Sequence, residues 1–338
     1  MKIAVRATNW IGDAVMSLPA LRALRTGFPD AEITVLARPW VADLYCGERS
    51  IDSVIALEGS PGPREWRVKW KLAQRLREKN FDLAILFPNS FESAALVFAA
   101  GIPRRVGYAR DGRGVLLTDP MDTPGADEIP RHERFFYLEM LRRAGLIAEF
   151  DRENEGIYLD GADAARARGR ELFEARGLPG PVVGVSPGAA YGTAKRWLPE
   201  KFAQAARELG GTVAVFGSAA ERSLCEDVAR QAGGTSLAGS TTLREFIDMT
   251  AACEVFLSND SGAMHIAAAL RVPSVTVFGP TDETATGPSG TNAGIVRQPV
   301  ECAPCRLREC PIDHRCMTRV TVEQVVSAGV RLRGCRKP

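Results

Sequence analysis

The 338-residue chain lacks the features that mark membrane-spanning, exported and nucleic-acid-binding proteins. No apolar run approaches the 18 or so residues that a membrane span requires. The N-terminal stretch MKIAVRATNW has neither the long apolar core nor the small-residue cleavage site of a signal peptide. A net charge of +2 is too small to indicate nucleic acid as a partner. These absences predict a soluble, cytoplasmic protein.

What the chain does contain is a regular alternation of short apolar runs with amphipathic stretches. Strands are predicted at 2–7, 33–38, 52–57, 81–88 and 105–108, then at 181–187, 212–217, 235–239, 254–260 and 274–279. Helices are predicted in the first half at 12–27, 39–46, 64–79, 90–100 and 131–146. Such alternation is typical of right-handed crossover units and parallel sheets.

The alternation stops at residues 147–163, an acidic and weakly periodic stretch that predicts a connection between domains. We therefore expect an α/β protein with two doubly wound domains, residues 1–158 and 159–338. Ligands of such domains bind at the carboxyl ends of the strands.

Two loops at strand ends in the second half are suited to a phosphate group. The segment VSPGAAYGTAKRWLPEKF (185–202) contains Ser186, Gly188 and Thr193, whose small side chains let backbone amides approach a phosphate, and Lys195 adds a positive charge. It has neither the Walker spacing nor the dinucleotide G-x-G-x-x-G pattern.

The second loop, NDSGAMHIAAAL (259–270), places Ser261 and Gly262 at the start of an alanine-rich helix, where they can donate hydrogen bonds to an anion. Asp260 is an acceptor and suits sugar hydroxyls. His265 faces either the sugar or the core. The loops together predict a nucleotide-diphosphate site.

An acid that follows a strand commonly holds ribose hydroxyls, and Glu221 in FGSAAER (216–222) has this position. Glu200 is a rival for the role. Either residue could instead be an exposed helix acid.

The segment TNWIGDAVMSLPAL (8–21) follows the first predicted strand with one glycine, Gly12, and an acid, Asp13. A carboxylate in the first turn of a helix is a poor neighbour for a phosphate. Asp13 either stabilises the helix N-terminus or serves as a catalytic base. Pro19 marks a kink or a new helix start after Ser17.

Four of the eight cysteines, Cys302, Cys305, Cys310 and Cys316, form a C-x2-C-x4-C-x5-C pattern in the loop 301–318. Only the first pair has a spacing familiar from zinc sites. The pattern leaves zinc binding, disulfides and free thiols open, and we predict no metal site.

The segments NWIGDAVMSLPALRAL, SPGAAYGTAKRWLPEKF, SNDSGAMHIAAALRVPSVTVFGPTDETATGPSG and CAPCRLRECPIDHRCMTRVT together resemble the ADP-heptose:lipopolysaccharide heptosyltransferases of glycosyltransferase family 9, most closely type II. The resemblance covers nearly the whole chain. It implies a GT-B architecture, in which two Rossmann-like domains face a cleft, the N-terminal one binding the acceptor and the C-terminal one the nucleotide-sugar. It also implies inverting transfer of heptose from ADP-heptose to the inner core of a membrane-anchored lipopolysaccharide precursor, heptosyl-Kdo-lipid A.

An inverting transfer needs a base that takes the proton of the attacking hydroxyl, and we assign this role to Asp13, with Gly12 allowing a tight turn beneath it. The chain has no Asp-x-Asp motif. Lys195, Thr193, Ser261 and Gly262 are therefore expected to stabilise the leaving diphosphate, without a metal ion or another cofactor.

Basic residues suggest where acceptor and membrane bind. The guanidinium groups of Arg104, Arg105, Arg110 and Arg113 match the carboxylates and phosphates of an inner-core acceptor, and Gly12, next to the base, is predicted to contact the acceptor as well. The segment 63–79 combines seven Lys or Arg with Trp66 and Trp70, which suits peripheral docking on the inner membrane; core packing of the tryptophans is the alternative.

Two other functions are consistent with parts of the pattern. A type I heptosyltransferase acting on Kdo-lipid A would share these loops. A non-catalytic nucleotide-sugar-binding protein would share the two domains, but it would not need a base such as Asp13.

Overall fold

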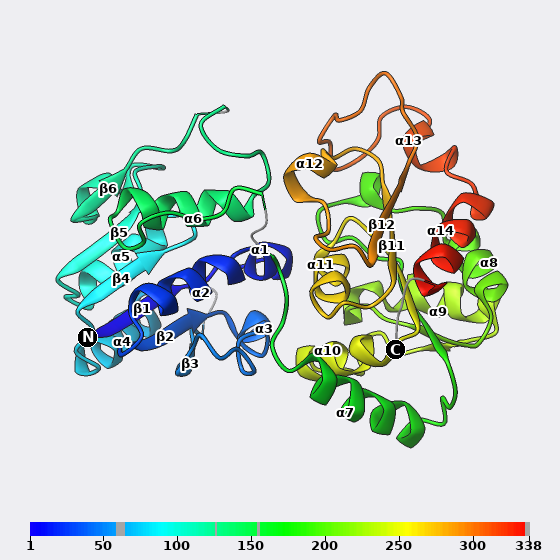
Figure 1. Cartoon of the computed structure of the whole chain (residues 1–338), viewed down its shortest axis with the longest axis horizontal. Coiled ribbons are helices and arrows are strands. Elements are labelled where there is room, and N and C mark those ends of the chain that lie inside the picture. Colours follow the sequence, from blue (N-terminus) through cyan, green and yellow to red (C-terminus); the bar gives the residue numbers. More distant parts are fainter. Residues whose placement is uncertain (59–64, 126, 154–155, 335–338) are drawn as a thin grey trace. The chain divides into compact units, whose positions relative to one another are not determined.

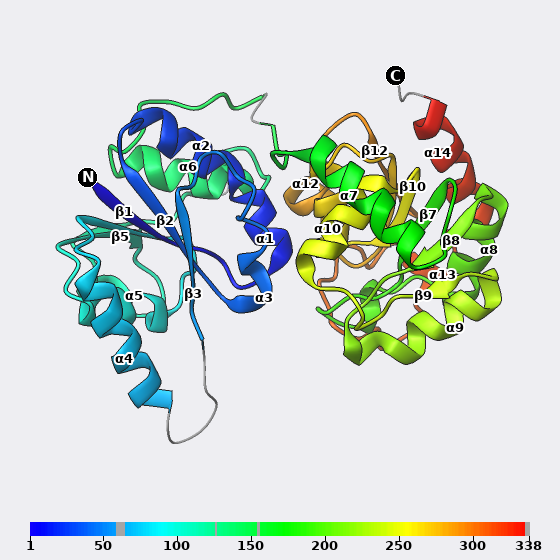
Figure 2. The same cartoon turned by 90° about the horizontal axis from the view of Figure 1, so that it is seen from below.

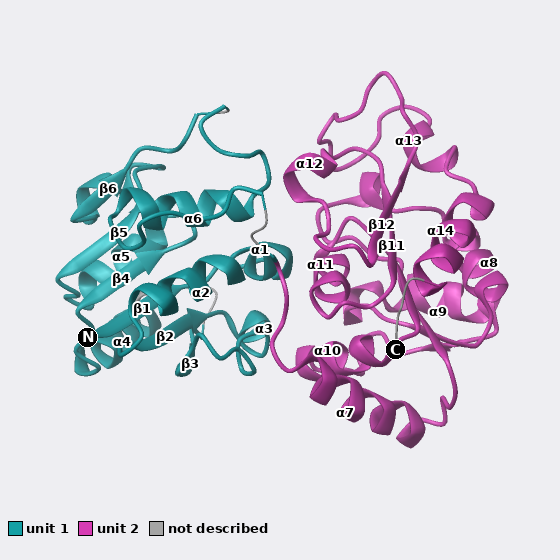
Figure 3. Ribbon diagram, in the orientation of Figure 1, with its two compact units in different colours: residues 1–156 teal, residues 157–338 magenta. Residues whose placement is uncertain are grey.

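The chain forms two compact units, Met1–Gly156 and Ile157–Pro338 (Figure 3). The structure, a computed structural model, describes residues 1–58, 65–125, 127–153 and 156–334. The division falls two residues before the boundary expected from the sequence.

The first unit is built on a six-stranded sheet in which neighbouring strands are parallel (Figure 1). The strands are β1 (Lys2–Arg6), β2 (Glu32–Ala37), β3 (Ser53–Ala56), β4 (Leu83–Leu86), β5 (Arg104–Tyr108) and β6 (Asp119–Met121), in the order β3-β2-β1-β4-β5-β6. The α-helices are α1 (Ile11–Met16), α2 (Leu18–Gly27), α3 (Pro39–Ala42), α4 (Glu65–Glu78), α5 (Phe91–Ala99) and α6 (Arg134–Arg143).

Helices cover both faces of this sheet, α2 and α6 on one and α4 and α5 on the other (Figures 1 and 2). Under α4 and α5, Leu76 and Val97 pack with the strand residues Leu36 and Leu86 in one buried cluster. Burial on both faces explains why the central strands read as nearly continuous apolar runs.

The second unit repeats this plan with another all-parallel, six-stranded sheet. Its strands are β7 (Val182–Ser186), β8 (Thr212–Val215), β9 (Thr235–Ser236), β10 (Val255–Asn259), β11 (Ser274–Phe278) and β12 (Ala293–Arg297), in the order β12-β11-β10-β7-β8-β9. The α-helices are α7 (Ala162–Ala175), α8 (Pro199–Leu209), α9 (Arg222–Ala232), α10 (Leu243–Ala252), α11 (Gly262–Ala269), α12 (Glu283–Thr286), α13 (Arg315–Thr318) and α14 (Val322–Gly334). Helices α8, α9 and α14 cover one face, and α7, α10 and α11 the other (Figure 2).

All ten predicted strands are confirmed, with ends that differ by up to three residues. The predicted helix 12–27 is two helices, because α1 ends before Ser17 and Pro19 lies in the first turn of α2. The edge strands β6 and β12 were not predicted, since β6 is three residues long with a proline and β12 has only a short apolar run.

The strand order reverses direction at one point in each sheet, between β1 and β4 in the first unit and between β7 and β10 in the second. Loops leaving adjacent strands there diverge and open a crevice for ligands. The predicted site segments 8–21, 185–202 and 259–270 follow β1, β7 and β10, three of the strands that flank these points. Within the described parts of the chain, no helix is long and apolar enough to cross a bilayer.

Candidate functional site

The loops after β7 and β10 in the second unit are tied together by one buried side chain, Asn259. Its Oδ1 accepts a hydrogen bond from the backbone N–H of Trp197 at 2.9 Å, and its Nδ2 donates to the carbonyl of Pro187 at 2.8 Å. Asn259 therefore fixes both ends of the loop 187–197. This residue was not predicted from the sequence, because an asparagine at a strand end carries no distinctive local signal.

Lys195 and Asp260 form an ion pair at the centre of this site. The Nζ–Oδ2 distance is 2.5 Å, and the side chains are 13% and 5% exposed. The hydroxyl of Thr281, which follows β11, donates to the same carboxylate oxygen at 2.6 Å. Lys195 is thus held in place by the protein, and Asp260 Oδ2 binds protein groups rather than the sugar hydroxyls expected from the sequence.

The pair leaves part of the lysine's hydrogen-bonding capacity available. An ammonium group has three donors, and Asp260 accepts one of them. The Nζ also lies 4.9 Å from the centre of the Tyr191 ring, a favourable cation–π contact. A positive charge positioned this way can attract an anionic ligand without reorganising.

The start of α11 offers further donors beside this pair. Ser261 is the N-cap residue in extended conformation, yet its side chain does not cap the helix. Its buried Oγ has no hydrogen-bond partner among the described residues. A buried hydroxyl without a partner is costly, so a ligand atom here would gain a bond the protein does not supply. Gly262 begins the helix, and His265 is buried one turn further on.

Glu221 lies against Gly188, in the loop that the sequence predicts to bind a phosphate. Its Oε2 accepts hydrogen bonds from the backbone N–H and hydroxyl of Ser218, at 2.9 and 2.8 Å, in a capping box. A Cβ atom at position 188 would lie only 2.0 Å from its Oε1. A larger residue at position 188 would therefore displace the Glu221 carboxylate from its present position.

The remaining predicted donor residues lie at the same edge of the sheet. Ser186 ends β7 and is buried, while Thr193 is exposed at the start of the short 3-10 helix that contains Lys195. The rival acid Glu200 lies exposed in the first turn of α8. The structure therefore gathers the whole predicted donor set on the loops after β7, β8 and β10.

The cysteine-rich segment 301–318 packs against the loop that carries Lys195. The carbonyl of Arg308 accepts a hydrogen bond from the N–H of Ala194 at 2.9 Å, and His314 Nε2 lies 2.8 Å from the Ala194 carbonyl. The Tyr191 hydroxyl donates to the carbonyl of Arg306 at 2.8 Å. A Cβ atom at Gly192 would lie 2.2 Å from the Arg308 carbonyl, so this close approach also requires glycine.

The cysteines of this segment differ in burial. Cys302 and Cys305 are exposed, Cys310 is partly buried and Cys316 is buried, all as free thiols. Burial, followed by its three cysteine neighbours, raises the pKa of Cys316 to about 11. The described residues contain no group of three or more His, Cys, Asp or Glu side chains arranged to hold a metal. Cys335 lies outside them.

In the first unit, Asp13 lies in the first turn of α1, the helix that follows β1. It is therefore close to the point where the strand order reverses. Trp10 is the N-cap residue and makes no side-chain cap. Gly12 is the second residue of α1, so its backbone is helical and does not form the tight turn we expected.

Asp13 has a second carboxylate in its neighbourhood, Glu133, which directly precedes α6. Burial and then the negative charge of Asp13 raise the pKa of Glu133 to about 7, and the nearby cation Arg110 opposes the shift. Burial, Asp13 and Glu133 also raise the pKa of Tyr137 well above its ordinary value. A carboxyl group whose pKa is raised towards neutrality, beside a second carboxylate, is a common arrangement at acid–base sites.

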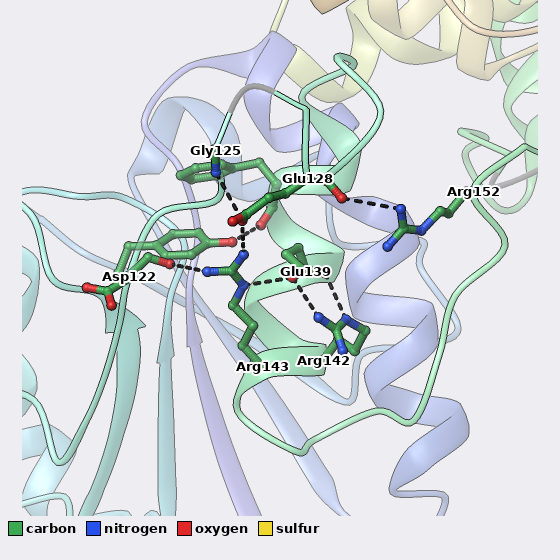
Figure 4. A network of polar contacts seen from close by, with 9 residues as sticks. Asp122, Gly125, Glu128, Glu139, Arg142, Arg143 and Arg152 are labelled. Atoms are coloured by element: carbon green, nitrogen blue, oxygen red, sulfur yellow. Dashed lines mark hydrogen bonds and ion pairs between the residues drawn. The ribbon is translucent and has the colours of Figure 1, made fainter.

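The loop that carries Glu133 is braced by a network around α6 (Figure 4). The buried carboxylate of Glu139 forms a bidentate ion pair with Arg142, with distances of 2.8 and 2.9 Å. It also accepts a hydrogen bond from Arg143 Nε at 2.7 Å. Arg143 also donates to the Asp122 carbonyl at 2.9 Å and pairs with Glu128. The residues before Glu133 are thereby fastened to the helix that follows it.

Three of the four predicted acceptor arginines bind the protein itself. Arg104 pairs with Asp119 at 2.9 Å, and Arg105 donates to the carbonyls of Ile102 and Leu116 at 2.6 and 2.7 Å. Arg113 is completely buried, where its guanidinium holds the loop after β4. Arg110 alone of the four is exposed and lies near the Asp13–Glu133 pair.

The predicted basic helix is present as α4, which buries Ala73 and Leu76 against the unit. Trp70 is 54% exposed, so packing in the core does not account for it. The side chain of Trp66 lies outside the described residues.

Comparison with known proteins identifies the fold and the family. Residues 69–315 match the family described as "Glycosyltransferase family 9 (heptosyltransferase)". The lipopolysaccharide heptosyltransferase 2 of Escherichia coli K12 is 33% identical over 310 residues, which cover 88% of each chain. The lipooligosaccharide heptosyltransferase 2 of Haemophilus influenzae is 31% identical over 328 residues, again 88% of each chain.

Solved structures agree with these matches. The E. coli ADP-heptose lipopolysaccharide heptosyltransferase II superposes with a TM-score of 0.83 at 29% identity, covering 98% of both chains. The E. coli heptosyltransferase WaaC with ADP gives a TM-score of 0.69 at 19% identity, covering 88% of this chain and 94% of that one, a likeness in fold. The prediction of a GT-B fold class with two Rossmann-like sheets is confirmed. The chain is a glycosyltransferase and belongs to family 9, the heptosyltransferases.

Proposed function

We propose that the protein transfers heptose from ADP-heptose to the heptosyl-Kdo-lipid A inner core of lipopolysaccharide, with inversion at the anomeric carbon. The observation that carries the proposal is the Lys195–Asp260–Ser261 arrangement at the crevice of a family 9 chain. The type II assignment is supported by relatives named heptosyltransferase 2, 30–33% identical over most of this chain.

On this proposal the second unit binds the donor. Lys195, Thr193, the Ser261 hydroxyl and the N–H groups at the start of α11 bind the diphosphate, whose negative charge grows as it leaves. Glu221 accepts hydrogen bonds from the ribose, and Gly188 lets the loop approach the nucleotide. These donors take the place of a divalent cation.

The first unit supplies the base and the acceptor site. A hydroxyl oxygen of the acceptor forms a bond to the anomeric carbon while the bond from that carbon to the diphosphate oxygen breaks. The hydroxyl proton passes to the Asp13 carboxylate and ADP leaves. Arg110 is the arginine best placed to bind an acidic group of the acceptor, because it is exposed beside the Asp13–Glu133 pair.

Peripheral binding to the cytoplasmic face of the inner membrane completes the proposal. Exposed Trp70 and the basic residues of α4 are the combination that favours a lipid–water interface. Such binding would bring the enzyme to a membrane-anchored acceptor.

A transfer assay tests the proposal. Purified protein is given ADP-heptose and Kdo-lipid A carrying either zero or one heptose, and product is followed by mass spectrometry. We expect product only with the heptose-bearing acceptor, with an anomeric configuration opposite to that of the donor by NMR. Product only with the heptose-free acceptor would make the enzyme type I, and no product with either would refute the proposed donor or acceptor.

A further inference from the structure

The first unit contains a cavity of about 570 Å³, to which the roles proposed above assign no ligand. Its lining residues come from helices α4 and α5 and from the segments that follow β1, β2 and β3. Figure 2 shows where these helices and strands lie in the unit. A volume of this size falls within the range of small-molecule sites.

The walls of the cavity are mainly hydrophobic. Leu57, Val68, Leu72, Ala95, Leu96 and Ala99 line it, joined at the surface by Trp70 and Phe91. Most of the α4 and α5 side chains in this set are only partly buried, and Trp70 and Phe91 are more than half exposed. Apolar surface left open between two helices favours an apolar ligand that would remove it from water.

Charged groups gather at the strand-end side of the cavity. Three cations, Arg6, Arg38 and Lys69, accompany two carboxylates, Glu58 and Glu92, which leaves a surplus of one positive charge. Both Arg38 and Lys69 pair with Glu92, at 3.0 and 3.3 Å.

Arg6 is the most buried of these cations, and its hydrogen bonds go to neutral oxygens, including Asn9 Oδ1 at 2.6 Å. Burial and then the positive charge of Arg38 lower its pKa to about 10. Two like charges held near each other in a pocket are stabilised by an anion. Glu92 meets part of this need and opposes the shift of Arg6, and the surplus positive charge is left for a ligand.

We propose that this cavity binds a single hydrocarbon chain that carries an anionic head group, with the chain between α4 and α5 and the phosphate or carboxylate at Arg6, Arg38 and Lys69. That this ligand is an acyl chain of the glycolipid acceptor rests on the function proposed above. The prediction that the cavity binds an alkyl phosphate does not depend on that function. A membrane phospholipid is the other source of the same chemistry.

Alkyl phosphates test the proposal on the full-length protein by calorimetry. Affinity should rise about fourfold for each methylene that enters the cavity, so decyl phosphate should bind roughly fifteenfold more tightly than octyl phosphate. Inorganic phosphate should bind far more weakly than either. Equal affinities across the series, or for phosphate alone, would overturn the proposal without any variant being made.

Matched variants locate the binding. Ala95→Phe fills the cavity and should weaken decyl phosphate binding at least tenfold, whereas Ala164→Phe, on exposed α7 surface, should not. Lys69→Ala should weaken it about tenfold, and Lys71→Ala, which is exposed on the same helix and does not line the cavity, should leave it unchanged. Unchanged binding in both Ala95→Phe and Lys69→Ala would refute the site.

Two further measurements show whether the bound hydrocarbon chain comes from the acceptor or from a membrane phospholipid. If the chain belongs to the acceptor, Ala95→Phe should raise KM for the acylated acceptor and leave KM for a deacylated acceptor unchanged. If it belongs to a phospholipid, Ala95→Phe should instead reduce binding to phosphatidylglycerol vesicles and leave both KM values unchanged, which overturns the acceptor assignment. Absence of any transfer would refute the proposed function while leaving the alkyl phosphate result intact.

Discussion

The carboxylate pair in the first unit makes a prediction about stability that can be worked from the structure. Glu133 has a pKa of about 7 in the folded protein, against 4.5 for an ordinary glutamate, chiefly because it is buried and secondly because Asp13 is near. This difference in pKa means that the folded state is roughly 3 kcal/mol more stable when Glu133 is protonated than when it is ionised.

The sign of the effect follows from linkage. Because folding raises the pKa of Glu133, its contribution to stability is fully present below about pH 4.5 and is lost as the pH rises through 7. Glu133→Gln has no such proton to lose. The free energy of unfolding of the variant, minus that of the wild type, should therefore widen by about 2 to 3 kcal/mol between pH 5 and pH 8.

Urea unfolding at several pH values measures this difference. Four of the five tryptophans lie in the first unit, so tryptophan fluorescence mainly follows the unit that carries Glu133. Glu78→Gln, at an exposed glutamate of α4, is the control and should show no widening. In an Asp13→Asn background the widening should shrink, because one cause of the shift has been removed. A pH-independent difference for Glu133→Gln would refute the reasoning.

Other predictions concern the roles proposed for the two units. Asp13→Asn should keep the fold and ADP affinity but lower the transfer rate about 100-fold or more with both substrates saturating; turnover near the wild-type rate would mean that Asp13 only stabilises a helix end. Lys195→Ala should weaken ADP binding by about 1.5–3 kcal/mol in calorimetry and destabilise the fold, since it leaves buried Asp260 unpaired. Adding Asp260→Asn should restore stability in urea unfolding but not ADP affinity. Turnover should survive saturating EDTA, and its loss with recovery in magnesium would assign the phosphate role to a cation. Gly188→Ala should weaken ADP binding by displacing Glu221, and the penalty should fall in a Glu221→Ala background; equal penalties in both would mean that the two residues are not coupled.

Much of the architecture was predictable because it is encoded locally. Strands buried on both faces must be apolar along their whole length, and the helices between them must repeat at helical spacing, so both appear in short windows of sequence. The loops at strand ends were equally visible, since the carboxyl ends of parallel strands meet at one edge of each sheet. Short edge strands such as β6 escaped because three residues with a proline give no such pattern.

The sequence by itself therefore determined the two α/β domains and the segments that carry the site, and its motifs resembled the family to which the chain belongs. Only the tertiary structure decided which side chains meet: Lys195 with Asp260, 65 positions away, the cysteine-rich segment with Ala194, and Glu133 with Asp13. It also decided that Arg113, a plausible ligand-binding residue by type, is buried and holds a loop. Local patterns report periodicity and turns, whereas the partner of a charged side chain depends on contacts between segments distant in the chain. The same residue type can bind a ligand or the protein itself, and burial and geometry alone distinguish the two.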